Sequence, residues 1–145
     1  MIRQATDADL AVIERIVTRA YSKYIVRIGA PPGPMLDDYA ARIAAREAFV
    51  SGSPVRALIV LVVAPDHLLL DNIAVDPDAQ GTGQGRILME FADAEARRRG
   101  YTELRLYTHQ TMVENIALYT RLGWVETGRG VQAGLARVFF RKNLA

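Results

Sequence analysis

Three glycines at alternate positions carry the clearest chemical pattern in the sequence. Gly81, Gly83 and Gly85 lie in the segment Gln80–Arg86, between a predicted strand and a predicted helix. Glycine lets backbone N–H groups approach an anion without interference from a Cβ atom, and a helix N-terminus favours negative charge. Because no Lys-Ser or Lys-Thr pair follows and residue 86 is arginine, neither the P-loop nor the dinucleotide fingerprint fits. The spacing predicts a diphosphate cradle of another kind, with a mobile turn before a helix as the alternative.

A second pair of polar side chains lies further along the chain. Asn115 and Tyr119 are four positions apart, so a helix places the amide and the phenol on one face, a turn apart. A phenol, with a pKa near 10, can donate a proton to a leaving group. A half-buried core tyrosine with an asparagine near the helix start explains the same spacing, so the pattern alone leaves both interpretations open.

The elements that must position these residues follow from the periodicity of the apolar side chains. Helices are predicted over about 7–21, 35–47, 83–99 and 112–122. Strands are predicted over 49–50, 55–64, 67–75, 104–109, 124–128 and 137–142, with Pro65-Asp66 as the turn of an antiparallel hairpin. Prolines and glycines exclude regular structure over 29–34. The order predicts a mixed α/β (α+β) sheet covered by helices.

Composition limits the classes of protein to which the chain can belong. With 145 residues, 50% apolar and 23% charged, a single folded domain over 1–145 is expected. The absence of cysteine excludes disulfides and a thiolate nucleophile, and two histidines speak against a metal site. A net charge of +2 indicates no nucleic-acid partner. Because no signal peptide or membrane span is visible, we expect a soluble cytoplasmic protein.

Taken together, the two motifs resemble those of the GCN5-related N-acetyltransferase (GNAT) family. Gln80–Gly85 fits that family's Gln/Arg-x-x-Gly-x-Gly/Ala loop, and Ile73–Pro77 resembles the end of the strand before it. Asn115–Trp124 loosely resembles its later Asn-x-x-Ala-x-x-x-Tyr-x-x-x-Gly-Phe segment, with tryptophan in the aromatic place. The resemblance covers about residues 68–128. It implies a central, mostly antiparallel twisted sheet of about six to seven strands, with splayed fourth and fifth strands, flanked by about four helices.

The resemblance further implies acetyl-CoA as the cofactor. Backbone N–H groups of the loop would hold the pyrophosphate, at positions Gln80, Gly81, Thr82, Gly83, Gln84, Gly85 and Arg86. The backbone of Ile73, Ala74 and Val75 would pair with the pantetheine arm, Asn115 would hydrogen-bond to the cofactor, and Tyr119 would be the general acid at its sulfur. The implied activity is acetyl transfer to a primary amine of a small molecule, peptide or protein by direct attack. The alternative is an acyl-CoA-binding or sensing module without productive catalysis.

The sequence leaves the general base open. Presenting a lysine-like amine in its neutral form at pH 7 costs roughly 4 to 5 kcal/mol. The strand glutamate that many family members use is replaced by Leu69. Asp71, two residues on and on the same face of a strand, is one candidate, and His109, with a suitable intrinsic pKa, is another. A chain of water molecules to bulk solvent is a third possibility.

The segment that joins the first two predicted helices, residues 21–39, would wall the acceptor site according to the resemblance. We take Tyr24, Arg27 and Tyr39 as candidate substrate-binding residues. A guanidinium fork suits a carboxylate, whereas Asp37 and Asp38 would attract an amine, so the acceptor class stays open. No membrane partner is expected, and a homodimer is common in the family.

Overall fold

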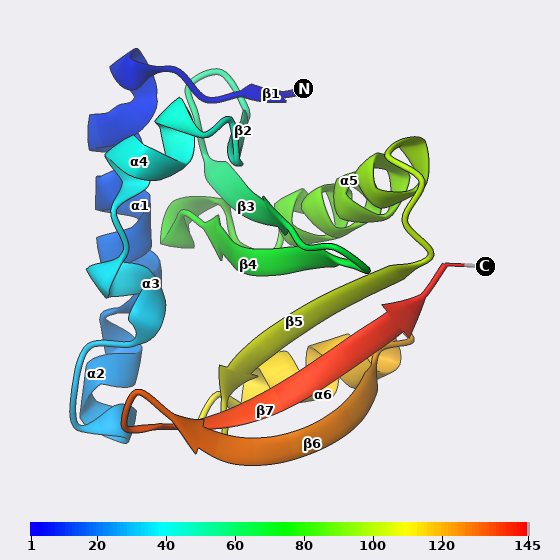
Figure 1. The fold of residues 1–145 in the computed structure, drawn as a ribbon. Coiled ribbons are helices and arrows are strands. Elements are labelled where there is room, and N and C mark those ends of the chain that lie inside the picture. The colour runs from blue at the N-terminus through cyan, green and yellow to red at the C-terminus, as the bar shows by residue number, and fades with distance from the viewer. Residues whose placement is uncertain (145) are drawn as a thin grey trace. The chain divides into compact units, whose positions relative to one another are not determined.

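The structure, a computed structural model, describes residues 1–144 and divides into two compact units (Figure 1). One unit comprises Met1–Val62 and Leu70–Ala92, and the other comprises Val63–Leu69 and the chain from Asp93 onward. Strand β4 (Leu68–Val75) and helix α5 (Gln84–Arg98) each contribute to both units. A single acetyltransferase domain over 1–145 stays a prediction.

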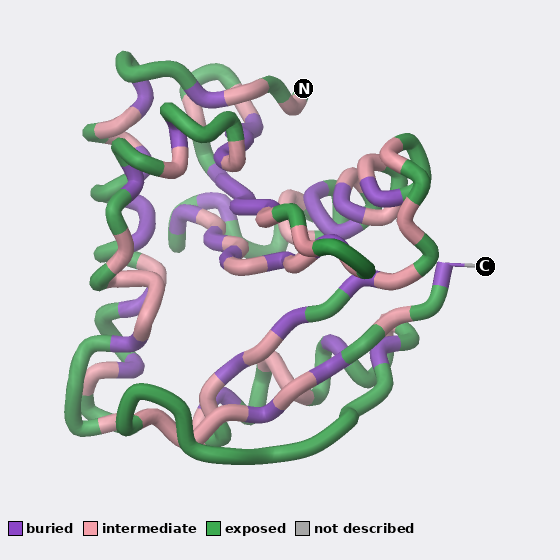
Figure 2. The backbone as a smooth tube through the Cα atoms, in the orientation of Figure 1, coloured by how far each residue is buried: buried purple, intermediate pink, exposed green. Residues whose placement is uncertain are grey.

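Four neighbouring strands belong wholly or in part to the first unit. They are β1 (Ile2–Gln4), β2 (Ala48–Ser51), β3 (Ala57–Val63) and β4. β1 pairs antiparallel with β2, and β2 pairs antiparallel with β3. β3 is buried over its first five residues (Figure 2), as a strand with apolar Val, Ile and Leu on both faces should be. The backbone N–H of Ala64 donates to the His67 carbonyl, which confirms the predicted turn.

Four α-helices lie between β1 and β2 in the sequence. α1 (Leu10–Tyr21) follows a short 3-10 turn that begins with a capping box between Thr6 and Asp9, and it buries Ile13, Ile16 and Val17. The others are α2 (Lys23–Ile28), α3 (Gly33–Leu36) and α4 (Tyr39–Ala44). α1 thus confirms the helix predicted over residues 7–21.

The predicted helix over residues 35–47 and the exclusion of regular structure over 29–34 are both wrong in part. Helix α3 begins at Gly33, and Pro34 lies in its first turn, where a missing N–H breaks no helical bond. Asp37 and Asp38 then adopt extended backbone. The Asp38 carboxylate accepts a hydrogen bond from the Ala41 N–H and starts a new helix. A capping residue therefore divides the predicted helix in two.

The second unit is built on three antiparallel strands and one helix. β5 (Glu103–His109), β6 (Val125–Gln132) and β7 (Leu135–Asn143) lie side by side in the order β5-β7-β6, with α6 (Val113–Arg121) between β5 and β6 in sequence (Figure 1). β4 runs parallel to β5 where Leu68 and Leu69 pair with Leu104 and Arg105.

The complete sheet has the order β1-β2-β3-β4-β5-β7-β6. It is a seven-stranded, mostly antiparallel sheet with one parallel pair, which confirms the predicted mixed α+β fold. Six α-helices accompany it in the described residues instead of about four, because the segment between α1 and β2 contains three short ones. No helix within residues 1–144 is long and apolar enough to span a membrane.

The β6–β7 hairpin is longer than predicted. All eight residues of β6 are exposed (Figure 2), and its sequence contains two glycines, so it lacks the alternating apolar pattern of a half-buried strand. Pairing with β7 nevertheless continues to the tight turn, where Ala133 and Gly134 both have positive φ. That turn matches the twist of antiparallel strands, and it extends the hairpin beyond what the side chains alone indicate.

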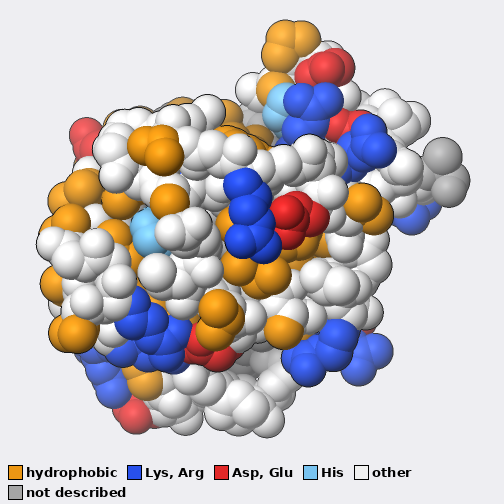
Figure 3. Space-filling model, turned by 90° about the horizontal axis from the view of Figure 1, so that it is seen from below, with side chains coloured by type: hydrophobic (Ala, Val, Ile, Leu, Met, Phe, Trp, Pro, Cys, Tyr) orange, Lys and Arg blue, Asp and Glu red, His pale blue; other side chains and the backbone are white. Residues whose placement is uncertain are grey.

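Many charged side chains on the surface are paired with the opposite charge (Figure 3). In the second unit, Arg98 and Arg99 both contact Glu95, and Arg129 contacts Glu126. Each is an i,i+3 or i,i+4 pair, and the exposed Arg129–Glu126 pair contributes little to stability.

Candidate functional site

The glycine loop of the first unit connects the end of β4 to the start of α5. Gly81 and Gly83 adopt φ angles of +83° and +87°, a region that L-residues with a Cβ rarely occupy. Residues 80–83 are exposed, and α5 begins at Gln84. The loop therefore presents exposed backbone at a helix N-terminus, as the spacing of the glycines predicts. None of residues 80–86 is acidic, so nothing in the loop opposes an anion.

A buried carboxylate anchors the loop at its start. Asp76 is 7% exposed, and its side chain accepts a hydrogen bond from the Asp78 N–H at 2.9 Å. Arg19 of α1 donates to both oxygens of Asp76 at 3.0 Å. The Asp76 N–H donates to the Arg56 carbonyl at 2.7 Å. These contacts tie the end of β4 to α1 and to the residue before β3. The backbone position at which the glycine loop begins is therefore fixed.

Two side chains at the start of α5 have defined partners. Gln84 accepts a hydrogen bond from the Ser51 hydroxyl at 2.9 Å. Arg86 lies 3.3 Å from Glu90 as an exposed i,i+4 pair. Since such a pair is weak in water, the Arg86 guanidinium can exchange this contact for one with a phosphate.

The last residues of β4 carry a buried hydrogen-bond network that sequence reasoning missed. The Tyr21 hydroxyl lies 2.5 Å from Asn72 Oδ1 and 2.8 Å from the Ile73 carbonyl oxygen. The Asn72 amide donates to the Tyr39 hydroxyl at 2.9 Å, and Tyr39 donates to the Pro34 carbonyl. The sequence signal that points to this network is an asparagine on the buried face of β4, which is otherwise apolar, because a buried amide needs hydrogen-bond partners.

Asp71 is held by an arginine of the first unit. Arg42 Nη2 lies 3.5 Å from its carboxylate, and the same guanidinium contacts Asp37 and Glu47 at 3.0 Å each. Burial alone lowers the pKa of Arg42, but hydrogen bonds to Asp37 and Glu47 outweigh it and raise that pKa above its usual value. The Asp71 carboxylate therefore shares the Arg42 guanidinium with two other carboxylates.

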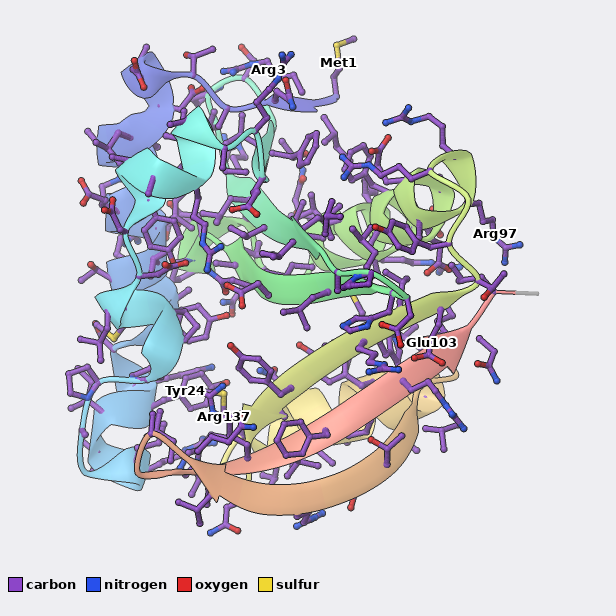
Figure 4. The ribbon with its side chains drawn as sticks, viewed as in Figure 1. Met1, Arg3, Tyr24, Arg97, Glu103 and Arg137 are labelled. Carbon is purple, nitrogen blue, oxygen red and sulfur yellow. The ribbon has the colours of Figure 1, made fainter. Side chains whose placement is uncertain are left out.

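The three candidate substrate-binding residues lie in different settings. Tyr24, labelled in Figure 4, is 5% exposed, and Lys23 Nζ and Arg27 Cζ each lie 5.1 Å from its ring centroid. Arg27 itself is exposed. Tyr39 is 4% exposed and engaged with Asn72, and burial, followed by the nearby acidic groups, raises its pKa. Of the three, Arg27 is the side chain that solvent reaches.

Tyr119 of α6 lies in the core of the second unit. It is 7% exposed, and its ring centroid lies 5.8 Å from Phe140 and 6.2 Å from Trp124. Asn115 is partly exposed, with its amide 3.8 Å from the Met112 sulfur. α6 therefore provides the predicted spacing of amide and phenol, and the aromatic neighbours fix the ring of Tyr119.

His109, at the end of β5, has one ring nitrogen engaged. Its Nδ1 atom lies 3.1 Å from the backbone nitrogen of Thr111 and 2.9 Å from that residue's hydroxyl. Burial, and then the charge of Arg137 in the register position opposite, lowers the pKa of His109. Arg137 is labelled in Figure 4, and its Cζ lies 4.1 Å from the Tyr107 ring centroid.

A cavity of about 490 Å³ lies in the second unit, between the start of β4 and strands β5, β7 and β6. His67, Arg105 and Tyr107 are among its lining residues, whereas Tyr119, Asn115 and His109 are not. The sequence motifs therefore do not line this cavity. Within residues 1–144, no group of three or more His, Asp or Glu side chains is arranged to hold a metal ion.

A comparison of the sequence with models of known protein families establishes the family to which this chain belongs. The model of the Acetyltransferase (GNAT) family matches residues 23–124, which include β4, the glycine loop, α5, β5 and α6. The chain belongs to the GNAT family. The predicted resemblance, over about residues 68–128, is thereby confirmed as far as residue 124, and it extends toward the N-terminus to residue 23.

Known members of the family give the degree of similarity. The [ribosomal protein bS18]-alanine N-acetyltransferase of Escherichia coli is 41% identical over 70 residues, which are 48% of this chain and 47% of that protein. The chain thus matches about half the length of this relative. The crystal structure of the Escherichia coli ribosomal-protein-S18-alanine N-acetyltransferase has a TM-score of 0.78 at 26% identity and covers 100% of this chain and 94% of that chain. The structure of yncA from Salmonella typhimurium with its cofactor acetyl-CoA has a TM-score of 0.73 at 25% identity, with the same coverage.

Proposed function

We propose that this protein is an acetyl-CoA-dependent N-acetyltransferase. The observation that carries the proposal is the loop between β4 and α5, where Gly81 and Gly83 hold positive φ and leave exposed backbone at a helix N-terminus. Membership of the GNAT family and a similar structure that contains acetyl-CoA support the choice of ligand. Acetyl-CoA supplies an acetyl group activated as a thioester, which a neutral amine can attack directly.

The residues present fit a diphosphate. The loop contributes N–H donors, and none of its residues is acidic. Arg86 adds a cation whose contact with Glu90 is an exposed pair. The buried Asp76 fixes the start of the loop. We assign pyrophosphate binding to Gln80–Arg86, and pairing with the pantetheine arm to the backbone of Ile73–Val75. Strand β4 pairs with β5 at Leu68 and Leu69.

We assign the general acid to Tyr119 and a cofactor contact to Asn115. When the amine nitrogen bonds to the acetyl carbon, the carbon–sulfur bond breaks and a thiolate leaves. A thiolate has an unperturbed pKa near 8.5 and a phenol one near 10, so a phenol can share or return a proton to it. The aromatic contacts to Phe140 and Trp124 favour this role, because they hold the ring in one orientation.

The favoured acceptor is the α-amine of a peptide or protein, and a small-molecule amine is the alternative. An α-amine, with a pKa near 8, costs about 1 kcal/mol to present as the neutral form at pH 7, against about 4 to 5 kcal/mol for a lysine. Arg42 contacts one oxygen of the Asp71 carboxylate at 3.5 Å, and Nδ1 of His109 accepts a hydrogen bond from Thr111, so each candidate base already has a partner that competes with a substrate proton. An acceptor that needs little help to lose its proton suits this site, and a similar protein is named for an alanine substrate.

Proton removal by water therefore becomes the first choice for the base, with Asp71 and His109 as the alternatives to exclude.

A cytoplasmic location, a homodimer and the absence of a nucleic-acid partner stay proposals. Cell fractionation and light scattering of the purified protein test the first two, and a titration with duplex DNA tests the third.

Isothermal titration calorimetry with acetyl-CoA, and with ATP and NADH as controls, tests the proposed function. We expect saturable binding of acetyl-CoA alone. A screen of amines for release of free thiol then separates an enzyme from a binding module. Equal binding of ATP would indicate a general nucleotide site, and binding without thiol release on any amine would support an acyl-CoA sensor.

A further inference from the structure

The hydroxyl of Tyr21 reaches the backbone of the strand to which we assign the cofactor. Tyr21 ends α1, and its hydroxyl oxygen lies 2.8 Å from the carbonyl oxygen of Ile73 and 2.5 Å from Asn72 Oδ1. A phenol has one proton, so Tyr21 shares it between the two acceptors. Tyr21 is 7% exposed and Asn72 is 4% exposed, so water does not compete freely for these groups.

A hydrogen bond to one carbonyl constrains the next backbone N–H. The Ile73 carbonyl and the Ala74 N–H belong to the same planar trans peptide unit, in which they point in opposite directions. A hydrogen bond that fixes the orientation of the Ile73 carbonyl therefore also fixes the orientation of the Ala74 N–H. Accepting this hydrogen bond also polarises the peptide group, so that its N–H becomes a stronger donor. Ile73–Val75 is the stretch that would pair with the pantetheine arm, so its backbone orientation matters for the cofactor.

Tyr21 is itself held in position by a relay of side chains. Asn72 lies between the two tyrosines and donates to Tyr39, which in turn donates to the carbonyl of Pro34. A buried hydroxyl needs only one hydrogen-bond partner, and Asn72 alone would meet that need. The second contact, to the Ile73 carbonyl, therefore goes beyond what burial requires. In this network Asn72 also orients the Tyr21 hydroxyl toward the strand.

We propose that Tyr21 is a positioning residue of the cofactor strand, whose hydroxyl holds the Ile73–Ala74 peptide unit in the orientation that acetyl-CoA binding requires. The inference rests on the proposed function. It assigns to Tyr21 no contact with the reacting atoms and no proton transfer in the reaction.

The test compares Tyr21→Phe with Tyr101→Phe. Both substitutions remove a hydroxyl that donates to a backbone carbonyl, since Tyr101 donates to Ala64 at 2.9 Å in the second unit. Both keep the ring, but Tyr21 also donates to buried Asn72 whereas Tyr101 is only partly buried, so we expect the larger loss of thermal stability in Tyr21→Phe. Two quantities are measured for each variant, the amide chemical shifts of ¹⁵N-labelled protein and the dissociation constant for acetyl-CoA.

We expect the Ala74 amide proton to move upfield in Tyr21→Phe, because its peptide unit loses a hydrogen bond at the carbonyl, and to stay in place in Tyr101→Phe. We expect the dissociation constant for acetyl-CoA to rise about fivefold in Tyr21→Phe, the effect of losing one net hydrogen bond, and to be unchanged in Tyr101→Phe.

An unchanged chemical shift of the Ala74 amide proton in Tyr21→Phe would overturn the inference. This holds whether or not the protein without substitutions binds acetyl-CoA. A moved amide with an unchanged dissociation constant, or equal effects of both variants on binding, would overturn it as well. If the unchanged protein does not bind acetyl-CoA, the proposed function fails and the cofactor part of the inference fails with it. The amide shift still reports the hydrogen bond in that case, so the two failures are distinguishable.

Discussion

Nδ1 of His109 accepts a hydrogen bond from the backbone N–H of Thr111, with 3.1 Å between the two nitrogens. A backbone N–H can only donate, so Nδ1 carries the lone pair and the neutral ring has its proton on Nε2. Burial and the charge of Arg137 favour this neutral form, because both lower the pKa of His109. His109, one of the two residues that the sequence offers as a base, is therefore neutral near pH 7, but the lone pair on its Nδ1 is already engaged.

The lowered pKa of His109 predicts how stability depends on pH. Between the usual value of 6.5 and the lower folded value, the unfolded chain binds more protons than the folded one, so the free energy of unfolding falls as the pH falls through this window. His109→Gln removes this contribution and should flatten the dependence below pH 6.5. Chemical denaturation at a series of pH values measures it. Parallel curves for the two proteins would show that His109 does not titrate as described.

Asp9 predicts a second pH dependence, at lower pH. The hydrogen bond from Arg3, opposed by burial and assisted by the Thr6 N–H, lowers the pKa of Asp9 to about 2. The resulting stabilisation is present above the unfolded value near 3.9 and is lost as the pH falls through about 2. Since Arg3 is half exposed, we expect Asp9→Asn to cost roughly 1 to 2 kcal/mol at pH 7. The exposed Asp7→Asn is the matched control, and an equal loss in both variants would contradict the account.

Gly83→Ala tests the glycine loop. A Cβ at residue 83 meets no heavy atom within 4 Å, so the cost arises from the positive φ, about 1 to 2 kcal/mol, and from a distorted cradle. Gly134→Ala in the β6–β7 turn imposes the same backbone cost, with φ +78° and equally open space. We expect only Gly83→Ala to weaken acetyl-CoA binding, by about tenfold or more, as measured by calorimetry. Equal binding by the two variants would remove the loop from the site.

Tyr119→Phe tests the general acid. The phenylalanine keeps the ring contacts with Phe140 and Trp124, so stability should change by less than about 1 kcal/mol. We expect kcat to fall roughly 100-fold, within the usual contribution of a positioned acid, while the dissociation constant for acetyl-CoA stays the same. Steady-state kinetics by thiol release, with Tyr101→Phe as the matched control, measure the effect. A variant as active as the unchanged protein would exclude Tyr119 as the acid.

The sequence was sufficient for the elements with strong apolar periodicity and for the glycine loop. Strand β1 was missed because three residues are too few to show a period, and it exists through pairing with β2. Strand β6 was predicted too short because its residues are exposed and its length follows from pairing with β7. In both cases the decisive contacts join residues far apart in the chain, or depend on a turn, which local pattern does not record.

In the candidate site, too, the features that depend on local sequence were predictable, and those that depend on distant contacts were not. The positive φ of Gly83 is compatible with the residue type, because glycine adopts this backbone without strain. The engagement of Asp71 by Arg42 and the network around Asn72 do not follow from local sequence. Their partners come from segments about 30 to 50 positions away, and no spacing rule connects such positions.

The most direct test of the account is acetyl transfer to a peptide that carries both a free α-amine and one lysine. The purified protein is incubated with acetyl-CoA and this peptide at pH 7.5, and fragment mass spectrometry locates any acetyl group. The account predicts one acetyl group on the α-amine, with the rate dependent on protein concentration, and a much slower reaction when the α-amine is blocked. Acetylation of the lysine alone would contradict the proposed acceptor, and no acetylation of this peptide or of any amine in the screen would contradict the enzyme itself.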